Sequence, residues 1–403
     1  MPHSRRDSIA WPQPAVAWEL LPAPQPELLT FPTGKDAKAQ VEPGQSVKIG
    51  QLLVQGALPV YSPVSGTVLD ADSTLVCVKN DYEDLALPCT PNPVLDGLSN
   101  EQIFAAIEHS GAASACGIPT SHTLRGLSSA PKQIVISCLD GSCLGMSQAF
   151  TMYHRGEQVL GGLRILMRLL GAPCGTILVS ADQKPLLDKV LRLLPADNTI
   201  TMRPVRPRYP APPAATLLKQ CRQTPDTALL LSAQEAAAIY DSVYFSTPVL
   251  KQMLTLATPD RLYCMYVMLG TPLVQVLSQA NLLESATAIA AGDGLTGRLL
   301  TDLSFPIQSA VSQFTLFSTP PSAPSPLCIH CGRCATVCPA NLRPDRVYSH
   351  LGRPASAKFL ARTASLCLQC GLCQYHCPAK LPLLQALEQI RTQQDVQEVL
   401  QHG

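Results

Sequence analysis

Two cysteine motifs near the end of the 403-residue chain constrain its fold more than any other feature. The first reads Cys328-Ile-His-Cys331-Gly-Arg-Cys334-Ala-Thr-Val-Cys338-Pro339. The second, after 28 intervening residues, reads Cys367-Leu-Gln-Cys370-Gly-Leu-Cys373-Gln-Tyr-His-Cys377-Pro378. Both have the spacing C-x2-C-x2-C-x3-C-P, with which thiolates hold [4Fe–4S] clusters. The sequence therefore predicts two [4Fe–4S] clusters within the last fifth of the chain.

The spacing also predicts which thiolates share a cluster. In proteins that hold two such clusters, the fourth cysteine of each motif binds the cluster of the other motif. We therefore expect two sets of ligands, namely Cys328, Cys331, Cys334 and Cys377 for cluster 1, and Cys367, Cys370, Cys373 and Cys338 for cluster 2. A glycine follows the second ligand of each motif (Gly332, Gly371), where the backbone must pass close to the sulfides. A proline after the last ligand prevents a helix from continuing through it.

Zinc and disulfides are the alternatives for these cysteines. Structural zinc sites usually use two separated C-x2-C pairs, whereas each motif here is a triplet followed by a fourth cysteine. Disulfide frameworks belong to small secreted domains, and this chain is long. The total of 16 cysteines fits a reducing, oxygen-poor cytoplasm. Among the remaining cysteines, a redox dithiol of Cys138 and Cys143 is a weaker interpretation than two small buried apolar residues.

Composition limits the partners and the location. The formal net charge is +1, which argues against nucleic acid or an anionic membrane surface as a partner. Arg333 and Arg343 lie near the cysteines and can steer an acidic partner, although the mixed overall charge makes this a weak indication. No run of 18 apolar residues is present, and Ser4-Arg-Arg-Asp7 lacks the apolar stretch that export requires. We expect a cytoplasmic protein, at most peripheral on the cytoplasmic face of a membrane.

Before the cysteine motifs, the sequence predicts an all-β part followed by mixed parts. Residues 1–35 are rich in proline, so we expect an extended arm there. Short β-branched runs separated by Pro-Gly and Ser-Gly turns within residues 36–90 predict a small all-β unit. Within residues 98–215, we expect helices at 101–108, 146–170 and 184–194, strands at 133–136 and 175–179, and a surface loop at 203–213. Strand, helix, strand and helix in this order predict a parallel α/β core.

The next part alternates strands and helices without this regular order. Within residues 216–312, we expect strands at 228–232 and 262–269 and helices at 233–243 and 272–277. Residues 320–403 hold the cysteine motifs and end in a helix over 383–400, which we expect to pack against the cluster-binding part. Two further segments stand out, Leu269-Gly-Thr-Pro-Leu273 and Ala291-Gly-Asp-Gly-Leu-Thr-Gly297.

This order of parts and these motifs resemble the RnfC component of the Rnf electron-transport complex and its relatives, among them the electron-transfer protein associated with proline reductase. The two glycine segments correspond to Gly-Thr-Pro and Gly-Gly-Pro-Met-Met-Gly in that family. The resemblance implies a multidomain fold of α/β and all-β parts. Its domains would be a hammerhead (barrel-sandwich) domain at 36–90, an α/β domain like the NADH- and FMN-binding flavoprotein of complex I at 98–215, a β-grasp domain at 216–312, and a helical 2[4Fe–4S] ferredoxin-type domain at 320–403.

The nucleotide-binding segments of that family are degenerate here. Its loop Gly-x-Gly-Gly-Ala-Gly-Phe-Pro-Thr corresponds to residues 112–120, where only Gly117, Pro119 and Thr120 are kept. Its Glu-Cys-Glu-Pro-Tyr segment corresponds to residues 140–144, where Asp140 is the one acid, and its Tyr-Pro-x-Gly-x-Glu segment keeps only Tyr209 and the proline after it. Each added Cβ obstructs the approach of backbone N–H groups to phosphate. The pattern predicts that NADH binding is lost and leaves FMN binding open.

Two functions follow. In the first, the chain relays electrons through its clusters from a reduced ferredoxin or flavoprotein to a partner reductase or an Rnf-like membrane complex, within anaerobic metabolism. In the second, it is an NADH:acceptor oxidoreductase subunit whose FMN divides the two electrons of a hydride between the clusters. We favour the relay, because three nucleotide segments have degenerated together.

Overall fold

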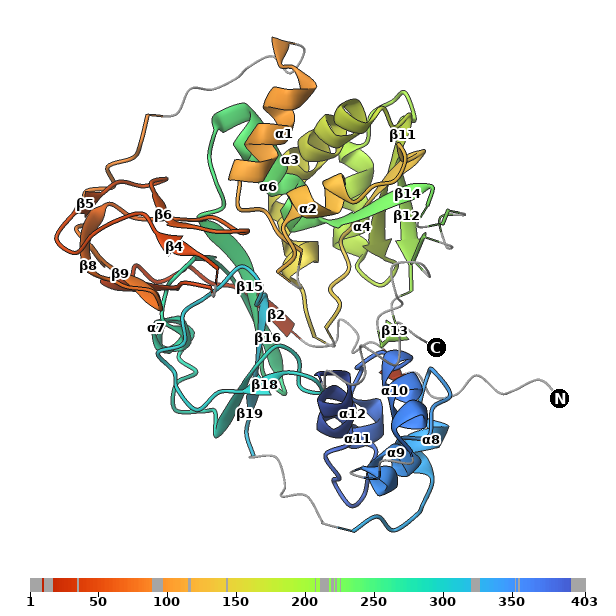
Figure 1. The fold of residues 1–403 in the computed structure, drawn as a ribbon. Coiled ribbons are helices and arrows are strands. Elements are labelled where there is room, and N and C mark those ends of the chain that lie inside the picture. Colours follow the sequence, from red (N-terminus) through yellow and green to blue (C-terminus); the bar gives the residue numbers. More distant parts are fainter. Residues whose placement is uncertain are drawn as a thin grey trace.

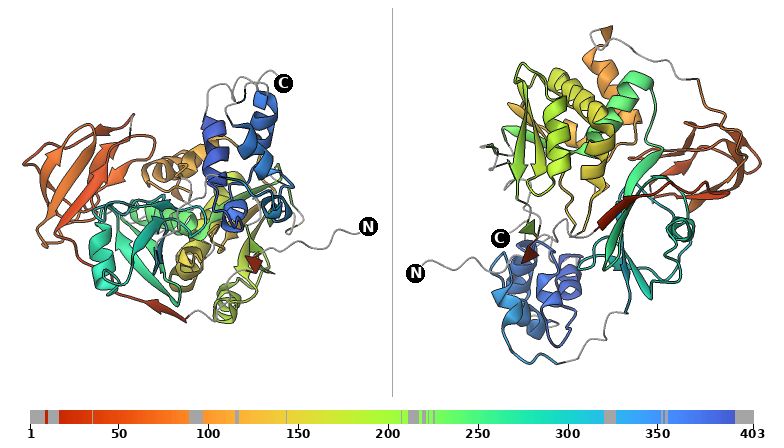
Figure 2. Two further views of the ribbon diagram at one scale, coloured as in Figure 1. Left: turned by 90° about the horizontal axis from the view of Figure 1, so that it is seen from below. Right: turned by 180° about the vertical axis from the view of Figure 1, so that it is seen from behind.

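The computed structural model describes residues 9–10, 17–34, 36–88, 97–114, 117–142, 144–206, 208–210, 217–218, 221, 223–224, 226–319, 327–351, 353 and 356–392. Within this part of the chain the strands form five sheets. Figures 1 and 2 show a β unit, an α/β unit, a second sheet and a small helical unit near the C-terminus.

The β unit consists of two small antiparallel sheets with the strand orders β3-β9-β8-β5 and β4-β6-β7. Its strands are β3 (Leu28–Pro32), β4 (Lys38–Ala39), β5 (Ser46–Val47), β6 (Leu52–Gln55), β7 (Val60–Tyr61), β8 (Gly66–Ala71) and β9 (Leu75–Asn80). Leu29, Phe31, Leu53 and Val76 are buried in one cluster between the strands. The expected all-β character of this region is therefore present.

The expected extended arm at 1–35 is wrong for three segments. β3 pairs with β9 in the β unit, β2 (Ala17–Leu20) pairs in parallel with β16 (Arg261–Met268), and β1 (Ile9–Ala10) pairs with β13 (Arg208–Tyr209). Alternate residues of β3 face the core, so this strand is fixed by burial of apolar side chains. The prolines between the strands obscure this short alternation in the sequence.

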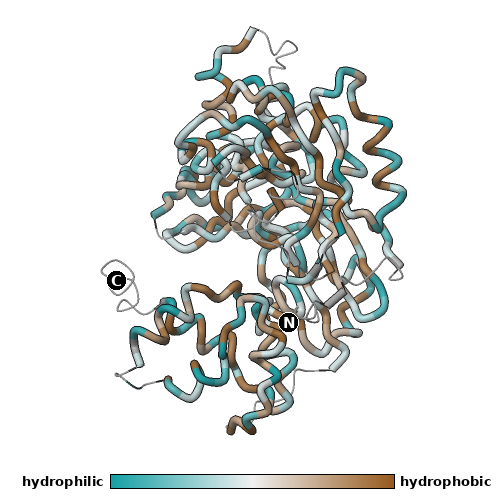
Figure 3. Tube along the Cα trace, turned by 90° about the vertical axis from the view of Figure 1, so that its right-hand side faces the viewer, coloured by the Kyte–Doolittle hydropathy of each residue, from teal (hydrophilic) through white to brown (hydrophobic). Residues whose placement is uncertain are grey.

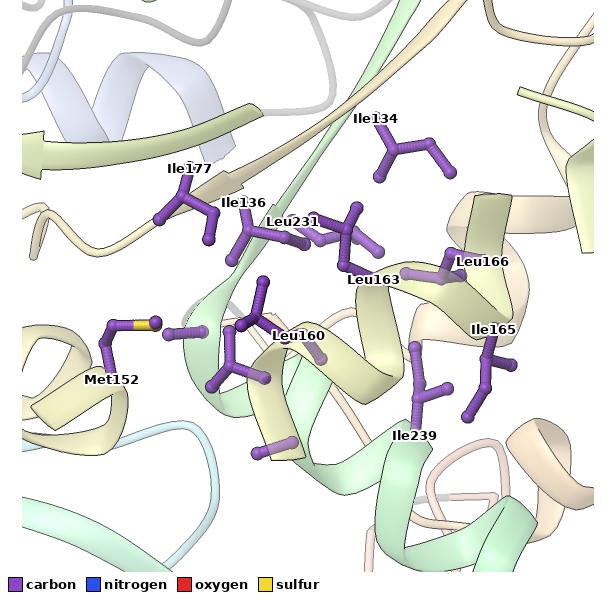
Figure 4. Packing of buried hydrophobic residues seen from close by; sticks show 14 of the residues in the cluster. Ile134, Ile136, Met152, Leu160, Leu163, Ile165, Leu166, Ile177, Leu231 and Ile239 are labelled. Carbon is purple, nitrogen blue, oxygen red and sulfur yellow. The ribbon is translucent and has the colours of Figure 1, made fainter. Parts of the chain in front are cut away.

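The α/β unit has a parallel sheet in the order β12-β11-β10-β14. Its elements are α1 (Asn100–His109), α2 (Thr120–Arg125), β10 (Gln133–Ser137), α3 (Ser147–Leu170), β11 (Cys174–Ser180), α4 (Lys184–Leu193), β12 (Ile200–Val205), β14 (Ala228–Ser232) and α6 (Ala233–Phe245). Figure 4 shows its core, in which isoleucine and leucine side chains of the sheet meet Leu160, Leu163 and Leu166 of α3 and Ile239 of α6. The predicted parallel α/β core is present.

Two expectations for this region need correction. β14 and α6, which we expected within 216–312, belong to the α/β unit, because β14 pairs in parallel with β10 and α6 packs against α3. The expected surface loop at 203–213 is also wrong at its start, since residues 203–205 complete β12 beside β11. The partner of β14 lies far away in the sequence, whereas the partner of β12 is the preceding strand β11.

A second sheet follows, with the order β18-β17-β19-β15-β16-β2. Its remaining elements are β15 (Lys251–Ala257), α7 (Leu273–Gln279), β17 (Ala288–Ala291), β18 (Arg298–Leu299) and β19 (Gln313–Phe317). The strand, turn and helix expected between residues 262 and 277 are confirmed by β16, by Gly270 with φ of 83°, and by α7. Val276 and Leu277 of α7 cover Leu254 and Phe314 of the sheet.

The cysteine motifs lie in the helical unit, which stands as a separate lobe in Figure 3. Its helices are α8 (Arg333–Thr336), α9 (Pro344–His350), α10 (Ala357–Ser365), α11 (Leu372–Tyr375) and α12 (Leu383–Thr392). The expected final helix starts at Leu383 as predicted, and the rest of the range 393–400 lies outside the described residues. Leu387 and Ile390 of α12 pack on α9 and α10, so this helix closes the unit.

Candidate metal centre

The two cysteine loops have nearly the same backbone conformation. His330 and Gln369 have φ of 54° and 52°, and Gly332 and Gly371 have φ of 73° and 70°. A short helix, α8 or α11, begins directly after each glycine. Glycine adopts such a left-handed conformation without the strain that a Cβ would add. The repeated sequence motif therefore folds as a repeated structural motif.

Backbone N–H groups already point at three of the sulfurs. The N–H of His330 donates to Cys328 Sγ at 3.4 Å, and the N–H of Gln369 donates to Cys367 Sγ at 3.3 Å. Cys338 Sγ accepts from the N–H of Leu342 at 3.3 Å. Hydrogen bonds to thiolate sulfur stabilise negative charge and raise the reduction potential of an iron–sulfur cluster. The left-handed residues thus place donors where thiolate ligands need them.

Cys338 belongs to the first motif but lies with the cysteines of the second. A small cavity of about 20 Å³ is lined by Cys338, Cys367, Cys370 and Cys373, together with residues that include Leu342, Leu384 and Leu387. Burial raises the pKa of the thiols of Cys367, Cys370 and Cys373, and the nearby Cys338 raises each pKa further. Four thiols from the two motifs therefore surround one largely apolar space.

Cys377 shows the reverse exchange. It is buried with Cys334, and Cys328 packs against the same cluster of side chains, which also includes Cys373 and Leu381. Cys331 is exposed to solvent. The structure thus brings Cys377 of the second motif to two cysteines of the first.

The donor set fits an iron–sulfur cluster better than a single ion. Within the described ranges, no three His, Cys, Asp or Glu side chains converge so as to hold one metal ion. In a cubane each thiolate binds its own iron, so its ligands lie around a volume rather than around a point. His376, next to Cys377, has a buried Nε2 without a hydrogen-bond partner among the described residues, and buried polar atoms normally have one.

The second cysteine loop contacts residues outside the helical unit. Tyr209 in β13 donates its hydroxyl to the carbonyl oxygen of Cys370 at 2.7 Å. A Cβ built on Gly371 would lie 2.6 Å from the carbonyl oxygen of Leu295, whereas one on Gly332 would meet nothing within 4 Å. Figure 1 shows this unit next to β13 and β18. The two loops are therefore alike in conformation but not in surroundings.

The remnants of the nucleotide loop are engaged inside the protein. Gly117 has φ of 75°, and Pro119 precedes α2, a helix of six residues. Thr120 is fully buried and donates its hydroxyl to Glu235 Oε1 at 2.9 Å. The other oxygen of Glu235 accepts from the N–H and the hydroxyl of Ser232, and burial raises the pKa of Glu235. Thr120 therefore ties α2 to the start of α6.

Asp140 is engaged in a similar way at the start of α3. Its carboxylate accepts from the hydroxyl of Ser147 and from the N–H of Gln148 at 3.1 Å. Burial raises the pKa of Asp140 to about 6. Cys138 is buried in the core of the α/β unit, and Cys143 lies outside the described residues.

Sequence reasoning missed two residues of this region. Glu235 has a local signal, since Ser232 and Glu235 form a capping box with the spacing S-x-x-E at the start of α6. The contact of Tyr209 with Cys370 has none, because it joins residues 161 positions apart.

Comparison with known proteins supports the assignment of the cysteines. Residues 327–381 match the family model described as a 4Fe–4S dicluster domain. The chain is 25% identical over 365 residues to the C subunit of the ion-translocating oxidoreductase complex of Serratia proteamaculans (strain 568). The match covers 81% of this chain and 51% of that protein, so the chain spans about half the length of this curated relative. The expected resemblance to the RnfC family is thereby confirmed.

Solved structures share the fold at low sequence identity. The crystal structure of an NAD+-reducing [NiFe]-hydrogenase in the air-oxidized state matches with a TM-score of 0.50 and 15% identity, over 77% of this chain and 65% of that chain. The H2-reduced state of such an enzyme matches with a TM-score of 0.49 and 13% identity, with the same coverage of both chains. The mixed α/β architecture with several sheets is thus a known one.

Proposed function

We propose, from this RnfC-like sequence and its 4Fe–4S dicluster domain, that the chain relays single electrons between a reduced donor and a partner protein. The donor would be a ferredoxin or a flavoprotein, and the acceptor a reductase or a membrane complex. Two [4Fe–4S] clusters, when bound, supply one-electron chemistry. The rest of the chain holds the clusters and positions them against partners.

The observation that carries this proposal is the exchange of cysteines between the two motifs. Cys338 shares a cavity with Cys367, Cys370 and Cys373, which supports cluster 2 on these four thiolates. Cys377 packs with Cys334 and Cys328, which supports cluster 1 on these three and on Cys331. Exchange of the fourth ligand is the arrangement of two-cluster proteins.

The interior bonds of the former nucleotide segments favour the relay over an NADH:acceptor oxidoreductase with FMN. The side chains of Thr120 and Asp140 are occupied by Glu235 and by the start of α3. A phosphate or ribose would have to compete with these buried bonds. In this proposal Gly117, Pro119, Thr120 and Asp140 stabilise the α/β unit.

The domain assignment belongs to the same proposal. We assign the β unit as a hammerhead domain, residues 98–245 as the α/β domain, residues 251–317 as a β-grasp domain, and residues 327–392 as the ferredoxin-type domain. Among the described residues, no helix is both long and apolar enough to cross a bilayer. We place the protein in the cytoplasm, because eight thiolate ligands require a reducing compartment.

Metal and flavin analysis of the anaerobically purified protein tests the relay. We expect about eight irons per chain, no flavin, and an absorption band that dithionite bleaches and NADH does not. A stoichiometric flavin reduced by NADH would overturn the relay in favour of the oxidoreductase. An iron-free protein with bound zinc would overturn both.

Ligand exchange is tested with the two exchanged cysteines. Cys377→Ala is expected to alter the EPR signal of the cluster held by the first triplet, and Cys338→Ala that of the second. Cys138→Ala, a matched control at a buried cysteine of the α/β core, should leave both signals unchanged. If Cys377→Ala altered the signal of the second triplet instead, each motif would hold its own cluster.

A further inference from the structure

The helical unit is basic, although the chain as a whole is nearly neutral. Residues 327–392 contain eight arginines and lysines against two acids, Asp345 and Glu388, which gives this segment a formal charge of +6. The whole chain has a net charge of +1, so the remaining residues have −5. Asp345 is buried and pairs with Arg343 at 2.7 Å. The helical unit therefore presents mostly positive charge to solvent.

The first cysteine loop is the open end of this unit. Leu327 and Ile329 are exposed by 72% and 63%, and Cys331 and Arg333 are exposed as well. The equivalent of Arg333 in the second loop is Leu372, which is buried. The second loop also contacts Leu295 and Tyr209, as described above. Leu366 and Leu368, the equivalents in the second loop, are exposed by 56% and 44%, so the first loop is the more exposed of the two.

Two exposed arginines lie on the helices that follow this loop. Arg333 begins α8, and α9, which packs against α8, presents the exposed Arg346. The two proposed clusters, counted together with their thiolate ligands, would carry net negative charge and offset part of the positive charge of the unit. The guanidinium groups of Arg333 and Arg346 nevertheless face solvent, where an incoming partner meets them first.

We propose that residues 327–333 together with Arg346 form the docking surface for an acidic electron-carrier protein. This inference rests on the proposed function and names the partner of cluster 1. Cys328, Cys331, Cys334 and Cys377 would hold cluster 1, whose iron would take up the single electron that the oxidised carrier loses. Leu327 and Ile329 supply a small apolar contact. Arg333 and Arg346 attract and orient the acidic carrier electrostatically.

The chemistry of the surface selects this partner over others. Opposite charges speed the encounter of two proteins and orient it. Interfaces between redox partners are small and short-lived. Two exposed apolar residues and two arginines are therefore enough for a contact of this kind. A basic carrier would be repelled, and a neutral one would gain no steering.

Binding of purified holoprotein to a small acidic ferredoxin, measured by calorimetry, tests the surface. We expect binding at about 20 mM salt that weakens strongly at about 200 mM. Arg333→Glu is expected to weaken binding roughly tenfold or more. Arg346→Glu should act in the same direction, and it lies outside the cysteine motif, so cluster assembly cannot account for its effect. Iron content is measured for each variant.

The matched control is Arg192→Glu, which makes the same charge change at an exposed site in the last turn of α4. It should change the affinity less than about twofold, and basic cytochrome c should not bind. The proposal is overturned if Arg192→Glu weakens binding as much as Arg333→Glu, if cytochrome c binds equally well, or if the ferredoxin does not bind at low salt. If the ferredoxin binds in the expected pattern but dithionite reduces no cluster, the docking surface stands and the proposed function fails.

Discussion

Thr120 and Asp140, two residues from the segments that resemble a nucleotide site, have structural roles in this protein. Thr120 and Asp140 are polar, buried and fully engaged, one with α6 and the other with α3. A buried polar group is stable only when it is hydrogen-bonded. These two residues therefore help to fix the start of two long helices.

Replacement of Asp140 tests this structural role through pH. Burial raises its pKa from 3.8 to about 6. Between these values the folded protein keeps the proton while the unfolded chain releases it, so this carboxyl lowers stability as the pH rises from 3.8 to about 6. Asp140→Asn carries no charge; its one oxygen can accept from the N–H of Gln148, while its NH2 group donates to the hydroxyl of Ser147, which can also accept. We expect the variant to be more stable than the wild type at pH 7 by about 1–3 kcal/mol.

The check is thermal unfolding of both proteins under anaerobic conditions across this pH range. The stability advantage of Asp140→Asn should shrink as the pH falls towards 4 and should be constant above the folded pKa. Asp260→Asn, at an exposed turn between β15 and β16, serves as control and should show no such trend. A variant that is destabilised equally at every pH would mean that ionised Asp140 is needed for its hydrogen bonds.

At the scale of elements, close packing of α3 and α6 holds the α/β unit together. A Cβ built on Gly162 of α3 would lie 1.8 Å from the carbonyl oxygen of Ala236 in α6. The backbones of the two helices therefore approach as closely as a glycine allows. Arg155 of α3 also pairs with Asp241 of α6 at 2.6 Å, which fixes the relative rotation of the helices.

Gly162→Ala is expected to lower the free energy of unfolding by about 3 kcal/mol, because the backbone of α6 cannot move aside cheaply. Helix propensity alone would make the alanine variant more stable by about 1 kcal/mol. A variant that is less stable than the wild type would therefore indicate a steric clash with α6. The matched control is Gly156→Ala in the same helix, where the nearest atom is the flexible end of Leu193. Denaturant unfolding followed by circular dichroism compares the two variants. Equal stabilities would contradict the close approach of α3 to α6.

The same elements show what the sequence can predict. The long helix α3 and the strands β10 and β11 follow from apolar periodicity, which is a local property. The strand and helix of 228–245 were also predicted, but with the wrong neighbours. An apolar run such as Ala-Leu-Leu-Leu suits any buried strand position, and its pairing with β10 is decided by residues about a hundred positions away.

The two cysteine sets are a prediction of a different kind. Ligand spacing within each motif fixes a local loop, and the exchange of Cys338 and Cys377 follows from the general geometry of two-cluster proteins. The basic surface around Arg333 was underrated, because the net charge of the whole chain conceals the imbalance between residues 327–392 and the rest. Net charge is therefore more informative when it is counted for each expected domain than for the whole chain.

At the scale of the whole molecule, the helical unit is anchored by one loop and open at the other. The carbonyl groups of Cys370 and Leu295 and the hydroxyl of Tyr209 meet where the second loop touches the body. Tyr209 also approaches Asp293 at 3.4 Å, and Asp293 accepts from the N–H groups of Leu295 and Thr296. This contact holds the second cysteine loop against the rest of the protein.

Gly332 and Gly371 allow this anchoring to be tested with a matched pair. Both have left-handed φ values, so alanine costs about 1 kcal/mol of backbone strain at either position. Only at Gly371 does the new Cβ also meet Leu295. We therefore expect Gly371→Ala to separate the helical unit from the body, with faster hydrogen exchange at Leu295 and Thr296 and a larger radius of gyration, whereas Gly332→Ala leaves both unchanged. Equal effects of the two variants would show that backbone strain, rather than the contact with Leu295, governs how the unit is held.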